Sequence, residues 1–228
     1  MKILSLGLDN SILNKTSALA QRIIEYGGLV EKYTVIVPNQ RNEKIELSDE
    51  VKAYGSGGGN KLRQFIKIYN IAKKLLREEK YDVMTVQDQY YLALVGVLLV
   101  KKFKLGLEIQ IHGWEKYYGI RKLIAKYVLP RANAVRCVSQ RLKKQLVNEF
   151  RVKEEKITVV PIYAQGARHK AQDTRQKDKK FIFLTVGRLV PVKNIGLQIE
   201  AMKEVAKKYP DAELWIIGDG PEKKNCEL

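Results

Sequence analysis

Residues 181–194, F-I-F-L-T-V-G-R-L-V-P-V-K-N, decide the fold that we expect for this chain. They open with a continuous apolar run, Phe181 to Val186, which is typical of a strand buried on both faces. Gly187 ends the run, and a helical pattern of apolar residues begins after Asn194. A strand, a turn and a helix N-terminus in succession predict a βα unit of an α/β fold.

Two cations lie within this turn: Arg188 follows Gly187, and Lys193 directly precedes Asn194. A helix N-terminus presents free backbone N–H groups, which favour anions. Arg can hold an oxyanion through two parallel hydrogen bonds, and Lys can act as a point charge. The turn therefore suits an anion with several oxygens, such as a diphosphate. The same residues also fit an ordinary βα loop with two solvated cations.

The rest of the chain alternates apolar strands with amphipathic helices. We predict strands at residues 2–8, 33–37, 51–54, 81–86, 105–111, 156–161 and 212–217. We predict helices from a cap at Thr16 or Ser17 to Ile24, and at 61–79, 90–102, 117–130 and 139–150, the last capped by Ser139. This order predicts an α/β fold: a Rossmann-like parallel sheet with helices on both faces, followed by a partial second βαβ unit. We expect an N-terminal domain at residues 1–163, a linker at 164–180 and the start of a second domain at 181–228.

A glycine-rich stretch, G-S-G-G-G-N-K-L at residues 55–62, resembles a nucleotide-binding loop at first sight. The phosphate-binding pattern needs Gly at position 60 and Ser or Thr at position 62, where this chain has Asn60 and Leu62. We interpret the stretch as a loop before a helix. Loops at strand ends line ligand clefts in open α/β sheets, so it could border a ligand site, together with Gly7 to Asn10.

His112 follows the strand predicted at 105–111 and is one of two histidines in the chain. The carboxyl edge of a parallel sheet is where such folds bind ligands. His112 is therefore a candidate functional residue, although a histidine satisfied within its own loop fits the sequence equally well.

The chain is strongly basic, with 42 Lys and Arg against 25 Asp and Glu and a net charge of +17. Such a balance favours anionic partners. Residues 117–144 contain two basic amphipathic helices, which could contact an anionic membrane surface at about 1 kcal/mol per cation. Helices with a core face and a solvated basic face explain the same pattern. We find no helix-turn-helix pattern or aromatic-rich single-strand motif, and we expect no nucleic-acid partner.

The two cysteines, Cys137 and Cys226, lie far apart without metal-ligand spacing, and we expect reduced thiols and no metal site. No apolar run approaches the roughly 20 residues that span a bilayer. We expect a cytoplasmic protein, with peripheral contact to the inner face of the plasma membrane as an open alternative.

Two blocks of the sequence carry a resemblance to a known family. The block V-G-R-L-V-P-V-K-N-I-G-L-Q-I-E-A-M, residues 186–202, resembles the opening of the C-terminal domain in glycosyltransferase family 4, whose members have the two-domain GT-B fold. The block A-E-L-W-I-I-G-D-G-P, residues 212–221, resembles the second strand and turn of that domain. The segment I-H-G-W-E, residues 111–115, is similar to a histidine segment of the family's N-terminal domain.

The resemblance implies a role for each matching residue. Gly187, Arg188 and Lys193 would hold the diphosphate of a nucleotide-sugar donor. The donor-side turn would be Gly218, Asp219 and Gly220, and His112 would act at the donor sugar through hydrogen bonding and charge stabilisation. The family needs no metal and no cofactor besides the nucleoside-diphosphate-sugar co-substrate, and it retains anomeric configuration.

The implied function is sugar transfer to a glycan or lipid-linked acceptor, such as a precursor of a cell-surface polysaccharide. Two departures from the family pattern stand out. Residues 161–166 lack the usual Asn-Gly turn, and the paired-glutamate motif of the second domain is absent. We therefore expect a truncated form with little or no activity. The alternatives are a non-catalytic basic module that binds membrane or nucleic acid, and a nucleotide-sugar epimerase.

Overall fold

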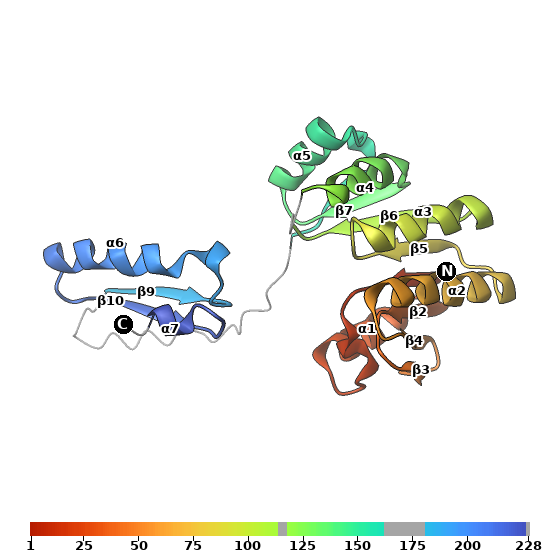
Figure 1. The fold of residues 1–228 in the computed structure, drawn as a ribbon, viewed down its shortest axis with the longest axis horizontal. Helices are drawn as coiled ribbons and strands as arrows, with labels where there is room; N and C mark the ends of the chain where they lie inside the picture. Colours follow the sequence, from red (N-terminus) through yellow and green to blue (C-terminus); the bar gives the residue numbers. More distant parts are fainter. Residues whose placement is uncertain (114–117, 162–180, 227–228) are drawn as a thin grey trace. The chain divides into compact units, whose positions relative to one another are not determined.

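The computed structural model describes residues 1–113, 118–161 and 181–226. The chain divides into two compact units, Met1–Ala164 and Gln165–Leu228 (Figure 1). The expected linker at 164–180 and the departure from the family pattern after Pro161 lie outside the described residues.

Unit 1 is built on an eight-stranded sheet in the order β3-β4-β2-β1-β5-β6-β7-β8 (Figure 1). Its strands are β1 Lys2–Leu6, β2 Lys32–Val37, β3 Asn42–Glu46, β4 Val51–Ser56, β5 Val83–Val86, β6 Gly106–Ile111, β7 Ala134–Cys137 and β8 Ile157–Val159. Every pairing is parallel except that of β3 with β4. In chain order, β2 and then β4 are added on one side of β1. The chain then crosses to the other side of β1, where β5, β6, β7 and β8 follow in succession. The switch in direction therefore falls between β1 and β5, where open α/β sheets bind ligands at the carboxyl edge.

Within residues 1–113 and 118–161, five α-helices and three 3-10 turns connect these strands. The helices are α1 Ala18–Gly27, α2 Lys61–Glu78, α3 Tyr91–Phe103, α4 Ile120–Val128 and α5 Gln140–Phe150, and the turns are η1 Asn10–Leu13, η2 Leu129–Arg131 and η3 Glu154–Lys156. Ser17, Asn60 and Ser139 each accept a hydrogen bond from the first turn of α1, α2 and α5. These caps resolve the choice between Thr16 and Ser17 and confirm Ser139.

Two apolar cores lie on the two faces of the sheet. One packs α1 and η1 against β2 and β4, and the larger packs α2, α3, α4 and α5 against strands from β2 to β8. Right-handed crossovers explain the division, because the chain reverses its direction along the sheet after β4. The predicted Rossmann-like sheet with helices on both faces is confirmed.

The prediction missed two strands of unit 1. In β3, N-E-K-I-E, charged residues dominate, and it pairs antiparallel at the edge of the sheet. In β7, A-V-R-C, only four residues pair, and Arg136 on one face interrupts the apolar pattern. Both strands form because a neighbouring strand supplies their hydrogen bonds, which a local apolar pattern does not reveal.

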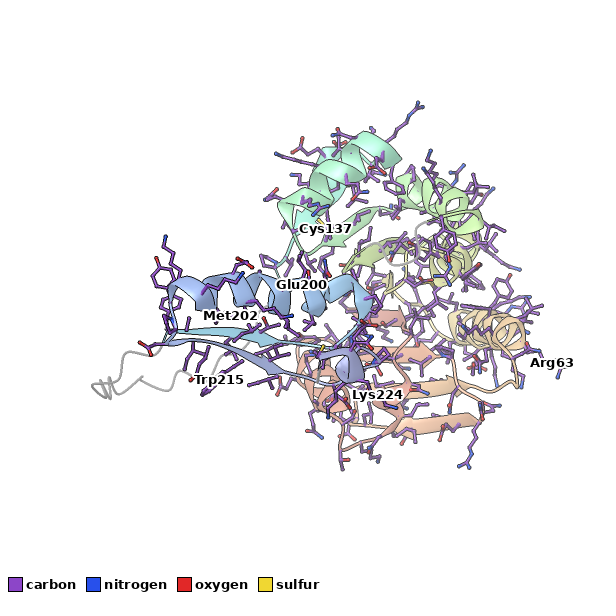
Figure 2. The ribbon with its side chains drawn as sticks, turned by 60° about the vertical axis from the view of Figure 1, so that its left-hand side comes forward. Arg63, Cys137, Glu200, Met202, Trp215 and Lys224 are labelled. Carbon is purple, nitrogen blue, oxygen red and sulfur yellow. The ribbon has the colours of Figure 1, made fainter. Side chains whose placement is uncertain are left out.

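Unit 2 contains two parallel strands, β9 Phe181–Val186 and β10 Ala212–Ile217, beside α6 Ile195–Lys208 (Figure 1). The short elements η4 Pro191–Lys193 and α7 Lys223–Cys226 complete it. In Figure 2, Met202 of α6 lies on the side of the strands, whereas Trp215 extends from their opposite face.

The expectation that Phe181 to Val186 is buried on both faces is wrong. On one face of β9 and β10, the side chains of Leu184 and Trp215 are 58% and 51% exposed, respectively. Thr185, on the other face, is hydrogen-bonded to α6. Within the described part of the unit, one helix and one neighbouring strand cover β9, so its apolar run has a covering layer on one side only.

Within residues 1–113, 118–161 and 181–226, we find no helix with the length and apolar character that a membrane span requires.

Candidate nucleotide-sugar site

Backbone hydrogen bonds join the two sequence blocks of unit 2 at the carboxyl ends of β9 and β10. The Gly187 N–H donates to the Ile217 carbonyl at 2.9 Å, and the Leu189 N–H donates to the Asp219 carbonyl at 2.9 Å. The Leu189 carbonyl in turn accepts from the Glu222 N–H at 3.0 Å. The two blocks therefore form one loop cluster, although about 30 residues separate them in the sequence.

Two glycines of the cluster are required by close backbone approach. A Cβ atom at Gly218 would lie 1.8 Å from the Gly187 carbonyl oxygen, and a Cβ atom at Gly220 would lie 2.3 Å from the Leu189 carbonyl oxygen. Neither position has room for a side chain. The glycines of the G-D-G-P turn thus let the second block pack directly against the first.

The N-terminus of α6 opens beside this cluster without a side-chain cap. Asn194, the N-cap residue, has left-handed backbone angles (φ 48°, ψ 51°) and makes no capping hydrogen bond, and the first turn contains no acidic residue. A Cβ atom at Gly196 would meet nothing within 4 Å. The positive end of a helix dipole therefore remains available to an anion.

Arg188 lies in the loop cluster between Gly187 and Leu189, Lys193 directly precedes the N-cap residue of α6, and both side chains are exposed. Neither side chain makes a hydrogen bond or ion pair with another described residue. Gln198 fixes the backbone next to Lys193: its Nε2 donates to the Lys193 carbonyl at 3.1 Å, and its Oε1 accepts from the Thr185 hydroxyl at 2.6 Å. Sequence reasoning missed Gln198, because its partner in β9 is visible only in the folded unit.

In unit 1, His112 follows β6 at the carboxyl edge of the sheet, as predicted, and its side chain is exposed. Partial burial lowers the pKa of His112 below its ordinary value of 6.5, and the positive charges of Arg136 and Arg22 lower it further. Gln89 holds the next residue in place, since its Nε2 donates to the Gly113 carbonyl at 2.8 Å. The lowered pKa of His112 favours the neutral form of its imidazole at pH 7.

A buried carboxyl group, missed in the sequence, lies at the end of β5. Asp88 accepts a hydrogen bond from the Leu92 N–H at 2.8 Å in the first turn of α3, and burial raises the pKa of its carboxyl group. Arg121 of α4 lies over the rings of Tyr90 and Tyr91, at 5.4 and 5.7 Å from their centroids. These contacts tie the start of α3 to α4. The adjoining residues 114–117 lie outside the described part of the chain.

The matches to protein families follow the two units. Residues 9–162 match the family described as Glycosyltransferase Family 4, and residues 167–228 match the family described as Glycosyl transferases group 1. The chain belongs to glycosyltransferase family 4. The resemblance of the two sequence blocks is thereby confirmed.

Two relatives illustrate this membership of the glycosyltransferase family. The chain is 28% identical over 175 residues to an uncharacterized glycosyltransferase of Methanocaldococcus jannaschii, covering 68% of this chain and 43% of the relative. It is 24% identical over 196 residues to the alpha-monoglucosyldiacylglycerol synthase of Acholeplasma laidlawii, covering 72% of this chain and 48% of the relative. The chain spans about half the length of the curated relatives it matches.

Solved structures of GT-B proteins share the fold. The lipopolysaccharide outer core galactosyltransferase WaaB in its apo form matches with a TM-score of 0.62 at 19% identity, covering all of this chain and 63% of WaaB. Anabaena HepE, solved with UDP and glucose, matches at 0.65 and 16% identity, covering all of this chain and 64% of HepE. The UDP-GlcNAc 2-epimerase of Methanocaldococcus jannaschii matches at 0.57 and 20% identity, over 99% of this chain and 67% of the epimerase.

The predicted donor residues belong to one place in unit 2. Gly187, Arg188, Lys193 and the turn Gly218–Gly220 all lie in the loop cluster or beside the opening of α6. His112 lies in unit 1. The roles of these residues in binding and catalysis stay predictions.

Proposed function

We propose that this glycosyltransferase transfers a sugar from a nucleoside-diphosphate-sugar donor to an acceptor, with retention of configuration and without a metal ion. The observation that supports this most is the uncapped N-terminus of α6 beside Arg188 and Lys193. The turn between β9 and α6 thus contains two cations and an uncapped helix N-terminus, and within the described residues neither cationic side chain makes a hydrogen bond or ion pair.

The proposed chemistry follows from where charge develops. As the bond from the sugar to the diphosphate breaks, negative charge accumulates on the leaving phosphate oxygens. The Arg188 guanidinium, the Lys193 ammonium and the first N–H groups of α6 would stabilise that charge. Gln198 would hold the Lys193 backbone in position. Loss of one preorganised donor at such a site costs roughly 10²–10³ in rate.

His112 would act at the sugar in its neutral form. Its lowered pKa keeps the imidazole uncharged near neutral pH, so that it can both donate and accept a hydrogen bond. In this role it orients the sugar hydroxyl groups and stabilises the positive charge that develops at the reacting carbon.

The acceptor that we favour is lipid-linked and presented at an anionic membrane surface. Ile120, Leu123 and Tyr127 recur on one side of α4 and are exposed, the first two at 65% and 68%. Lys122 and Lys126 lie among them and are exposed. The positions of α4 that face the core are Ala125 and Val128, so this outward ridge of Ile120, Leu123 and Tyr127 does not belong to the core. An apolar ridge among cations suits the boundary of an anionic bilayer.

A binding experiment tests the donor proposal on the chain itself. Uridine diphosphate and inorganic pyrophosphate are titrated separately while the backbone amides are followed by NMR. We expect shifts at Gly196 and Leu197. Arg188→Ala and Lys193→Ala should each weaken binding about tenfold, the usual worth of a charge-assisted hydrogen bond.

Lys203→Ala is the matched control, because Lys203 is an exposed lysine of the same helix outside the loop cluster. Binding should be unchanged in this variant. The donor proposal fails when the α6 amides do not respond, or when Arg188→Ala behaves like Lys203→Ala.

A nucleotide-sugar epimerase is the second candidate, since an epimerase shares the fold. Incubation with a labelled nucleotide sugar and an acceptor separates the outcomes. Labelled acceptor supports transfer, whereas a labelled epimer of the donor supports epimerisation. A basic, non-catalytic module would give neither product, would not respond to uridine diphosphate, and would bind nucleic acid in a salt-dependent manner.

A further inference from the structure

The turn between β5 and α3, residues 87–90 with the sequence Q-D-Q-Y, is polar and yet largely buried. The side chains of Asp88 and Gln89 are only 7% and 8% exposed. A buried polar group costs free energy unless it is hydrogen-bonded, so both side chains need partners inside the fold. Those partners are backbone groups of neighbouring elements, and one of them directly follows His112. We call residues 87–90 the β5–α3 turn.

Hydrogen bonds to the backbone fix the β5–α3 turn on both sides of Gln89. The Gln87 N–H donates to the Leu6 carbonyl at the end of β1, at 2.9 Å. On the other side, the Leu92 N–H donates to the Asp88 Oδ2 at 2.8 Å, and the N–H groups of the two residues before Leu92 donate to the same carboxyl group. Asp88 thereby satisfies N–H groups at the start of α3. The backbone that carries Gln89 is therefore held in place.

Gln89 makes its hydrogen bond where the pairing of β6 stops. β6 pairs with β5 up to Ile109 and with β7 up to Ile111, so the ladder ends before His112. Two residues beyond Ile111, the Gly113 carbonyl accepts a hydrogen bond from the Gln89 Nε2 at 2.8 Å. A Cβ atom at Gly113 would meet nothing within 4 Å, and glycine has wide backbone freedom, so this bond restricts a residue that local packing leaves open. His112 thus lies between two fixed points, the paired Ile111 and the Gly113 carbonyl.

Helix α4 contacts the same turn through Arg121. The guanidinium lies 5.4 and 5.7 Å from the ring centroids of Tyr90 and Tyr91, close enough for a cation to be attracted to an aromatic face. Burial raises the pKa of Asp88, and the charge of Arg121 is near enough to oppose that rise. The charges that lower the pKa of His112 do not include Arg121. An effect of Arg121 on His112 would therefore not be a direct effect of its charge.

We infer that Gln89 is a positioning residue for His112. Asp88 and Arg121 support Gln89 by fixing the β5–α3 turn. That His112 acts at the donor sugar rests on the proposed function, whereas its positioning by Gln89 rests on contacts within unit 1. A group that acts on a substrate must be held within about 0.5 Å of its working position. The hydrogen bond to the Gly113 carbonyl supplies this restraint beyond the end of the strand ladder.

NMR on the whole chain without any ligand tests this inference. Gln89→Met keeps the length of the side chain and removes its donor, whereas Gln89→Asn keeps the amide and shortens its reach. In both variants, the backbone order parameter of Gly113 should fall from a rigid value of about 0.85 to below about 0.6. The pKa of His112 should rise toward 6.5, because a mobile loop leaves the imidazole less buried. If one variant fails to fold, the other still decides.

Each substitution has a matched control in the same chain. Gln87→Met changes a glutamine of the same turn whose bond to β1 comes from the backbone, which the substitution retains, and it should change neither readout. Arg121→Met should change both readouts in the same direction as the Gln89 variants, but by less. Arg141→Met removes an exposed arginine of α5 and should change neither.

The inference is overturned when both Gln89 variants behave like Gln87→Met, which would mean that Gln89 only satisfies its own buried position. A lower unfolding temperature without any change at His112 would mean the same. An Arg121→Met variant that behaves like Arg141→Met would overturn the support assigned to α4. No nucleotide is present in this experiment, so its result is independent of the diphosphate titration that tests the donor proposal.

Discussion

Gly218 lies where the two sequence blocks of unit 2 pack directly against each other, so a larger residue there should disturb both blocks. A Cβ atom there would overlap the Gly187 carbonyl oxygen at 1.8 Å, so Gly218→Ala must push β9 and β10 apart at their carboxyl ends. We expect a loss of about 1–3 kcal/mol in the free energy of unfolding of unit 2, the usual cost of overpacking. Urea unfolding followed by hydrogen exchange of β10 peptides measures it.

Gly196→Ala is the control for this prediction. It adds the same methyl group elsewhere in unit 2, in the first turn of α6, where a Cβ atom meets nothing within 4 Å. This variant should unfold at the same or a slightly higher urea concentration, since Ala is the better helix former. Equal stability of the Gly218→Ala variant and the unchanged chain would contradict the close approach.

His112 should titrate below its ordinary pKa of 6.5, and Arg136→Gln should raise that pKa because it removes a nearby positive charge. A lowered pKa means that the folded chain binds this proton less readily than the unfolded chain. The contribution of His112 to stability should therefore be constant above pH 6.5 and fall as the pH drops below it. The imidazole proton signals in an NMR titration report the pKa directly.

Arg141→Gln serves as the reference for this titration, because it removes an exposed arginine of α5 that is not among the charges acting on His112. It should leave the pKa of His112 unchanged. A pKa at or above 6.5 in the unchanged chain would be inconsistent with the partial burial and the two arginines.

At the scale of elements, the proposed contact of α4 with an anionic membrane surface can be tested by one substitution. Leu123→Asp places a charge on the outward ridge and should weaken binding to vesicles of anionic phospholipid about tenfold or more, because burial of a leucine contributes about 1.5–3 kcal/mol. Vesicle co-sedimentation at low and moderate salt measures the change. Leu98→Asp, at an exposed leucine of α3, should bind like the unchanged chain. Equal losses in both variants would mean that α4 is not the contact.

Helix N-termini in this chain fall into two groups with different consequences. Those of α1, α2 and α5 carry a Ser or Asn whose side chain caps the first turn, whereas the N-cap residues of α3, α4 and α6 make no side-chain cap, and that of α6, Asn194, is left-handed. The capped ends satisfy their N–H groups within the fold. The end of α6 is uncapped, and in the proposed function its first N–H groups bind the diphosphate.

At the scale of the whole molecule, the two units should differ in stability. Figure 2 shows long polar side chains such as Arg63 on the surface of unit 1, where the apolar residues of the strands are largely buried. In unit 2, the apolar side chain of Trp215 is exposed. Unit 2 leaves one face of β9 and β10 exposed. Native-state hydrogen exchange should therefore show amides of β1 and β6 protected at least about tenfold more than those of β9 and β10. Equal protection in both units would contradict this.

The sequence alone determined the α/β alternation, the cap at Ser139, the family and the positions of Gly187, Arg188 and Gly218 in strand-to-helix turns. These features depend on residues close together in the chain: apolar runs, short polar caps and glycine turns. Only the tertiary structure decided the pairing of β3 and β7, the choice of Ser17 as a cap, the outward ridge of α4 and the exposed face of β9. These depend on which distant segments supply a hydrogen-bond partner or a covering layer, and no local pattern of residues encodes that choice.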